Sequence, residues 1–180
     1  MRQRFIVTLS TALLISGCAT HRLAPLQAEA VLESRSQSAV VGKAVLSEQR
    51  GGVRAHVELA GLNPGSEHGF HVHEKGDCSA ADASSAGGHF NPDQTAHGAH
   101  GSPSSHTGDL PSLVADGTGR VMVDLLLENV SLSAGPKSLV GRSLVVHRDR
   151  DDFVTQPSGN SGPRVACGVI VLMATGRKHE

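Results

Sequence analysis

Residues 69–109 constrain the fold of this chain more than any other stretch. They contain six of its eleven histidines, together with Cys78 and Asp109, and are rich in Gly, Ser and Ala. The histidines are His71, His73, His89, His97, His100 and His106. Because large apolar residues are few, this stretch cannot build a hydrophobic core of its own. Imidazole is the commonest metal ligand in proteins, so we expect bound metal to order the segment.

The N-terminus has the pattern of a secretory signal. Arg2 and Arg4 precede an apolar run over residues 5–15, which is too short to span a bilayer and ends in small residues. We therefore predict a signal peptide over residues 1–17. Residues 18–30 show no sustained period and are predicted to form a tether.

The residues at the predicted cleavage site suggest a lipid anchor. Ile15-Ser16-Gly17-Cys18 resembles the lipobox of bacterial lipoproteins, which implies lipid on Cys18. Ala19 is not acidic, and by resemblance to sorting rules this favours the outer membrane. We therefore expect a periplasmic protein attached to a bacterial membrane. The alternative is a plain signal peptide followed by an unmodified cysteine.

Two cysteines remain once Cys18 is set aside. In an exported protein an even remainder suggests a disulfide, here between Cys78 and Cys167. Two free thiols are the alternative.

Most of the chain has the alternating pattern of half-buried β-strands. In residues 53–59, four apolar residues alternate with Arg54, His56 and Glu58, so His56 is expected to face solvent. Further strands are predicted near residues 31–32 and over residues 39–46, 119–127, 143–147 and 165–173. Residues 74–117 and 149–163 show no such pattern, and loops of this length need a functional reason. Short strands without a convincing helix indicate an antiparallel sandwich or barrel.

One short strand places two histidines on the same face. Phe70 and Val72 would point to one side of it, and His71 and His73 to the other, roughly 6.5–7 Å apart. Two such imidazoles can converge on one metal ion. His68 has the same parity but lies further along, so we expect it to hydrogen-bond a loop.

The ligand types point to two metals. Three histidines with one aspartate suit a closed zinc site, and a set made only of imidazoles suits copper. The spacing would allow the two sites to share one histidine. The net charge of −1 gives no signal for nucleic acid.

Five motifs in order closely resemble the copper,zinc superoxide dismutases. They are GFHVHE at residues 69–74, GHFNP at 88–92, HTGDL at 106–110, GRSLVVH at 141–147 and GPRVACGVI at 162–170. The resemblance implies an all-β, eight-stranded antiparallel Greek-key barrel or sandwich over residues 31–176, immunoglobulin-like, with two long functional loops. A polar tail, residues 177–180, would follow. The implied activity is dismutation of superoxide to oxygen and hydrogen peroxide by cycling Cu(II)/Cu(I), as periplasmic antioxidant defence.

The resemblance also implies a ligand set. The copper ligands would be His71, His73, His89 and His147. The zinc ligands would be His89, His97, His106 and Asp109. His89 would bridge the two ions and pass a proton to substrate. Zinc would have a structural role.

Other residues would support these ligands. The resemblance implies that Asp151 hydrogen-bonds His71 and His97, and that Arg164 lies beside copper and positions the superoxide anion. It also pairs Cys78 with Cys167.

Some features depart from the family pattern or leave alternatives. His100 has no counterpart there and is either an exposed loop residue, which we favour, or an alternative zinc ligand. Lys75, Lys137 and Arg142 are candidates for steering superoxide, though each could be an ordinary surface charge. A copper-buffering protein on the same scaffold and a zinc hydrolase are the competing functions. The protein could be a monomer or a homodimer.

Overall fold

The computed structural model describes residues 24–174. The predicted signal peptide, Cys18 and the first part of the tether lie outside these residues, as does the tail. Within them, no helix has the length and apolar character needed to cross a membrane. Strand β1 (Gln27–Ser34) begins inside the segment predicted as a tether. Its inward positions include the small Ala28 and Ala30, which gave the alternation too weak an apolar signal.

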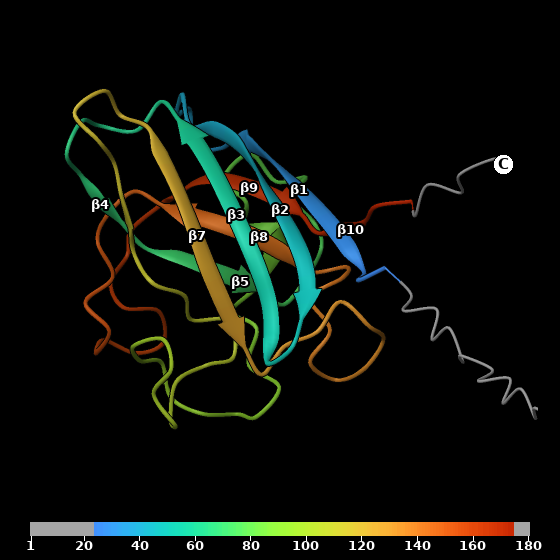
Figure 1. Ribbon diagram of the computed structural model, residues 1–180. Helices are drawn as coiled ribbons and strands as arrows, with labels where there is room; N and C mark the ends of the chain where they lie inside the picture. The colour runs from blue at the N-terminus through green and yellow to red at the C-terminus, as the bar shows by residue number, and fades with distance from the viewer. Residues whose placement is uncertain (1–23, 175–180) are drawn as a thin grey trace, which may run out of the picture.

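The fold is all-β and antiparallel, as predicted. The other strands are β2 (Val41–Gln49), β3 (Gly52–Ala60), β4 (Glu67–His68), β5 (Phe70–His73), β6 (Leu113–Val114), β7 (Val121–Glu128), β8 (Ser143–His147), β9 (Arg164–Val169) and β10 (Val171–Leu172). Eight of the ten strands form one sheet: seven lie in the order β5-β8-β9-β1-β2-β3-β7, and β10 pairs with β1. Strands β7, β3, β2 and β1 run across the front in Figure 1, and β5, β8 and β9 cross behind them.

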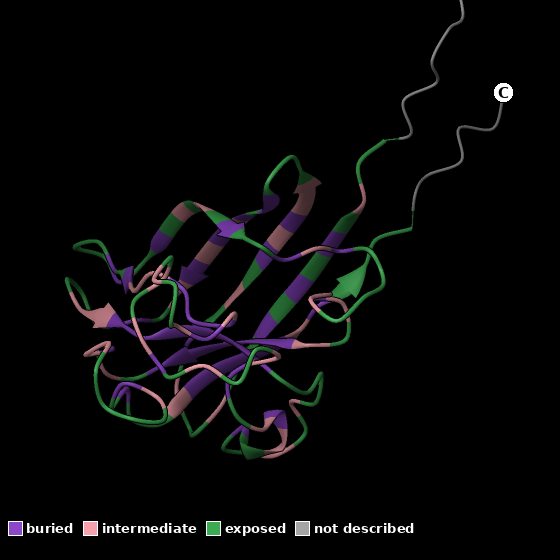
Figure 2. Cartoon of the chain, turned by 90° about the horizontal axis from the view of Figure 1, so that it is seen from below, coloured by how far each residue is buried: buried purple, intermediate pink, exposed green. Residues whose placement is uncertain are grey.

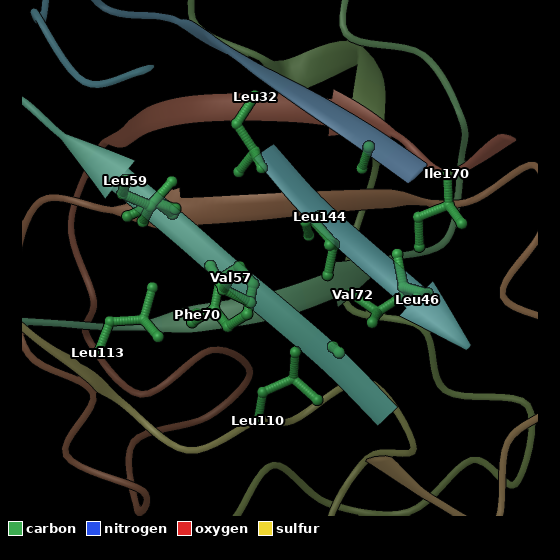
Figure 3. Packing of buried hydrophobic residues seen from close by; sticks show 14 of the residues in the cluster. Leu32, Leu46, Val57, Leu59, Phe70, Val72, Leu110, Leu113, Leu144 and Ile170 are labelled. Atoms are coloured by element: carbon green, nitrogen blue, oxygen red, sulfur yellow. The ribbon is translucent and has the colours of Figure 1, made fainter. Parts of the chain in front are cut away.

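One apolar core fills the space between the two sides of this curled sheet. Figure 3 shows Val57 and Leu46 of the front strands facing Phe70 and Leu144 of the rear strands. The alternation predicted for β3 and β7 is confirmed, since their inward residues are buried or partly buried and their outward ones more exposed. Burying such side chains contributes about 1.5–3 kcal/mol each and gives the molecule a rigid frame.

The rear strands β5 and β8 are buried on both faces. Figure 2 shows this as continuous burial on one side of the molecule and alternating burial on the other. Phe70 and Val72 share one side of β5, as predicted, and the structure shows that this side faces the core. The outer face is covered by the two long loops. His71 and His73 lie on that outer face and are 0% and 1% exposed. A polar face can be buried so deeply only if its groups have partners.

The first long loop is more ordered than its sequence predicts. It includes a short 3₁₀ helix, η1 (Ser84–Ala86), and β6, which pairs with β4. Neither element is long enough to produce a recognisable period in the sequence.

Candidate metal centre

The free edge of the sheet at β5 brings the first loop to the histidines. Phe90 N–H donates to the carbonyl oxygen of Val72 at 2.8 Å, and Val72 N–H donates to that of Gly108 at 2.9 Å. The main chain thus forms isolated bridges between His71 and Asp109 and between His73 and His89. A Cβ atom on Gly108 would collide with the Val72 carbonyl, so this close approach requires glycine.

Four histidines form the first cluster on this outer face. They are His71, His73, His89 and His147, all buried, and their ligand atoms lie within 4.8 Å of one another. The rings of His71 and His89 stack with centroids 3.9 Å apart, and Nε2 of His73 lies 3.4 Å from Nε2 of His147. Among the described residues, His71 Nδ1 and His89 Nε2 are buried without any hydrogen-bond partner. Two unpartnered imidazole nitrogens in one buried cluster fit a metal ion.

The opposite ring nitrogens have fixed acceptors. His71 Nε2 lies 2.7 Å from Asp151 Oδ2, His73 Nδ1 lies 2.9 Å from the Gly87 carbonyl oxygen, and His147 Nδ1 lies 3.1 Å from that of Gly162. A proton on each of these nitrogens donates outward, which leaves the inner nitrogen free as a ligand.

Burial keeps these rings neutral. It holds the pKa of His71 and of His73 well below the usual value, with further lowering from nearby histidines, and lowers the pKa of His147 to about 4. A neutral imidazole is the form that binds metal.

The second cluster is built around Asp109. Its Oδ1 lies 2.8 Å from His89 Nδ1, 3.0 Å from His97 Nδ1 and 3.3 Å from His106 Nδ1. Its Oδ2 accepts hydrogen bonds from the main-chain N–H groups of Gly98 and His106. Burial opposes ionisation of this carboxyl, but the hydrogen bonds from His89 and Gly98 keep the pKa of Asp109 below its usual value. Three imidazoles and one carboxylate fit a four-coordinate zinc ion.

His89 belongs to both clusters. Its Nδ1 faces Asp109, and its Nε2 is one of the two unpartnered nitrogens of the first cluster. One imidazole therefore offers a ligand atom to each of two metal positions.

Asp151 connects the clusters from the second loop. Its Oδ2 meets His71 Nε2, and its Oδ1 meets His97 Nε2 at 2.9 Å. The carboxylate is 1% exposed, so it is strongly ordered by these two rings and by the N–H of Phe153. These are the two contacts that the family resemblance implied.

A bulge places Arg164 beside the first cluster. Val146 pairs with Ala166, but the next residue, His147, pairs with Arg164, so Val165 is passed over. The guanidinium donates to the carbonyl oxygens of Ala83 and Gly87, each at 2.6 Å. Arg164 lines a cleft of about 400 Å³ together with His73, His89 and His147.

A disulfide attaches the first long loop, whose carbonyl oxygens accept hydrogen bonds from Arg164, to strand β9 of the sheet. Cys78 and Cys167 are bonded, with Cα atoms 5.8 Å apart and a sequence separation of 89. Cys167 packs with Val145 of β8 and with Ala83 of the loop. The predicted pairing is therefore confirmed.

His100 was expected to be an exposed loop residue, and that expectation is wrong. It is partly buried, and its ring lies between two carbonyl oxygens, 2.8 Å from that of Asp109 and 3.2 Å from that of Leu126 in β7. It belongs to neither metal cluster. His68 has the predicted structural role, with its ring contacting the carbonyl oxygen of His147 and the hydroxyl of Ser66.

The steering candidates do not line the cleft of Arg164. Lys137 pairs with Asp93 at 2.7 Å, and Arg142 lies 4.2 Å over the ring of Phe90. Lys75 is exposed. No sequence pattern singles out Gln156, whose side chain makes two hydrogen bonds to the main chain of His97.

Comparison with known proteins agrees with this geometry. The family profile described as copper/zinc superoxide dismutase matches residues 40–170. The Cu-Zn superoxide dismutase 2 of Aquifex aeolicus is 40% identical over 139 residues, covering 75% of this chain and 81% of the relative. The extracellular Cu-Zn superoxide dismutase of Drosophila melanogaster is 37% identical over 181 residues, covering 94% and 98%.

A solved structure has the same fold. The crystal structure of a superoxide-dismutase-like protein from Bacillus subtilis superposes with a TM-score of 0.71 at 36% identity. The match covers 78% of this chain and 95% of that one. The arrangement of strands and loops around the two clusters is thus one that occurs in related proteins.

Proposed function

This chain belongs to the copper/zinc superoxide dismutase family, and we propose from that premise how its own residues carry out the dismutation of superoxide. Copper and zinc are the cofactors of the family, and the two buried clusters fit them. The observation that supports the proposal most directly is that two nitrogens of the four-histidine cluster, His71 Nδ1 and His89 Nε2, are buried without a hydrogen-bond partner.

The four-histidine cluster would hold copper, and the Asp109 cluster would hold zinc. Copper, when bound, supplies reversible one-electron chemistry, through which two superoxide anions and two protons become oxygen and hydrogen peroxide. Zinc has no redox chemistry of its own. Its ligands come from a loop with little secondary structure, so zinc would order that loop and hold His89 and Asp109 in place.

Arg164 would bind the substrate anion. Superoxide is small and offers little shape to recognise, so a fixed positive charge beside the copper ligands is the main source of affinity. The two carbonyl acceptors hold the guanidinium at the cleft with His73 and His147. His89 would hold a proton at Nε2 only while this atom is not bound to copper, and would donate it to the substrate as peroxide forms. Water would supply the second proton of hydrogen peroxide.

The protein would act outside the cytoplasm. Its relatives include enzymes named as extracellular, and it contains a disulfide, which is typical of oxidising compartments. The finer proposal is a periplasmic enzyme with lipid on Cys18. Labelling cells with a radioactive fatty acid tests it: the unmodified protein should be labelled, and Cys18→Ala should not. Equal labelling of the two would contradict the anchor.

Metal analysis and dismutation assays test the function itself. The domain that begins at Ala19, purified with both metals, should contain about one copper and one zinc per chain and dismutate superoxide rapidly. Full occupancy of both sites without dismutation would favour the copper-buffering alternative. Dismutation that persists after removal of copper would exclude the proposed mechanism.

A further inference from the structure

One side chain of the second loop makes two hydrogen bonds to the main chain of a metal-site residue. Oε1 of Gln156 accepts from the N–H of His97 at 2.8 Å, and its Nε2 donates to the carbonyl oxygen of His97 at 3.0 Å. The same Nε2 donates to the carbonyl oxygen of Val154 at 3.2 Å, which orients the amide. Gln156 therefore pairs with both the main-chain N–H and the carbonyl oxygen of His97, as the main chain of a neighbouring β-strand would.

His97 depends on these bonds because of where it lies. It belongs to no helix or strand, and within residues 24–174 its main chain has no main-chain hydrogen-bond partner. Of its two neighbours, Ala96 is exposed, and Gly98 is held through its N–H, which donates to Asp109 Oδ2 at 3.0 Å, so Gln156 provides the hydrogen bonds to the main chain of His97 itself. Its ring, however, is completely buried between Asp109 and Asp151. A ring with two fixed carboxylate partners needs a backbone at a fixed position.

The segment that carries Gln156 is itself well ordered. Asp152 accepts hydrogen bonds from the N–H groups of Val154 and Thr155 and from the Thr155 hydroxyl. Asp151 lies at the start of this turn and Gln156 at its end. The turn therefore contacts His97 at two points, the ring through Asp151 and the main chain through Gln156.

We propose that Gln156 is a positioning residue of the zinc site. It fixes the backbone of His97 so that ring Nδ1 faces Asp109 while Nε2 faces Asp151. The inference rests on the zinc site of the proposed function. It concerns zinc more than copper, because the two hydrogen bonds of Gln156 hold His97, which belongs to the Asp109 cluster and not to the four-histidine cluster.

Zinc release from the fully loaded protein to an excess of a chromophoric chelator tests this role. Gln156→Leu keeps the size of the side chain but makes neither bond, so zinc should leave about tenfold faster, as for other partners that orient ligands. Copper release should stay within about twofold of that of the unmodified protein, because no copper ligand loses a partner. Gln156→Glu keeps the acceptor for His97 N–H and should be intermediate. Val154→Ala, exposed in the same turn, is the matched control and should change neither rate.

A second measurement separates positioning from general stability. Co²⁺ bound in place of zinc gives visible absorption bands that depend on its coordination geometry, and Gln156→Leu should shift them. Denaturant unfolding of the metal-free proteins shows how far the variant is destabilised. A lower unfolding midpoint with unchanged zinc release and an unchanged cobalt spectrum would overturn the proposal, as would equal acceleration of zinc and copper release. If the unmodified protein binds no zinc, the proposed function fails as well.

Discussion

Nη2 of Arg164 donates a hydrogen bond of 2.6 Å to the carbonyl oxygen of Gly87. The same oxygen lies 2.9 Å from Nδ1 of His73. A single main-chain carbonyl therefore orients both the proposed anion-binding residue and a proposed copper ligand. The shared acceptor fixes the guanidinium relative to the His73 ring, although the arginine side chain is long and flexible.

Replacing Arg164 should separate copper binding from catalysis. In Arg164→Ala the cleft loses its fixed positive charge, so we expect dismutation to fall by roughly tenfold to a hundredfold. Copper content should not change, because Arg164 contributes no ligand atom. Pulse radiolysis together with metal analysis measures both quantities.

The matched control for this experiment is Arg148→Ala. Arg148 is an exposed arginine paired with Asp149, and its removal should leave the rate nearly unchanged. Equal dismutation rates for Arg164→Ala and the unmodified protein would contradict the anion-binding role.

Breaking the Cys78–Cys167 disulfide should lower both stability and activity. The bond closes a long loop, and its loss typically costs about 2–5 kcal/mol. Because Ala83, which accepts a hydrogen bond from Arg164, lies in the attached loop, the guanidinium should also lose order. Denaturant unfolding and dismutation assays of Cys78→Ser measure the two effects, and identical unfolding midpoints would contradict the stabilising role.

The strands and the two histidines of β5 could be predicted because both leave local signals. Residues 53–59 alternate strictly, and β3 faces the core on one side and solvent on the other. His71 and His73 are two residues apart on one strand, so their shared face follows from strand geometry alone. The histidines in the loops could be assigned only by resemblance to a family, because no local period relates residues 89, 97 and 106.

The features that could not be predicted from the sequence depend mainly on contacts between distant segments. The pairing of the loop with the free edge of β5 is made by main-chain groups, which every residue has, so the sequence does not encode it visibly. Polar side chains such as His100 and Gln156 look like surface residues until the fold places carbonyl oxygens beside them. The start of β1 was missed because alanine is weakly apolar.

His100 should stabilise the first loop without binding zinc. Its ring contacts the carbonyl oxygens of Asp109 and Leu126, so it connects the loop to β7. His100→Leu should lower the free energy of unfolding by about 1–3 kcal/mol. Zinc content should stay at one per chain, in contrast to His97→Leu, which removes a proposed ligand. Metal analysis of the two variants decides the matter: an equal loss of zinc would restore His100 as a ligand.

The metal-free protein should lose stability as the pH falls below about 6.5. Burial lowers the pKa of His71, His73, His106 and His147, the last to about 4. The unfolded chain therefore binds protons that the folded chain excludes, and protonation favours unfolding. The stabilising effect of these neutral rings is fully present above pH 6.5 and decreases progressively toward pH 4.

Urea unfolding of the metal-free protein between pH 7.5 and 4.5 measures this effect, with the range set by the usual histidine pKa of about 6.5. His147→Gln has one titrating ring fewer, so its unfolding free energy should change less steeply with pH. Metal-loaded protein should decline more steeply over the same range, because protons then also compete with the metals for the ring nitrogens. A metal-free protein equally stable at both ends of the range would mean that the buried rings are not neutral, and the cluster would then not be preformed for metal.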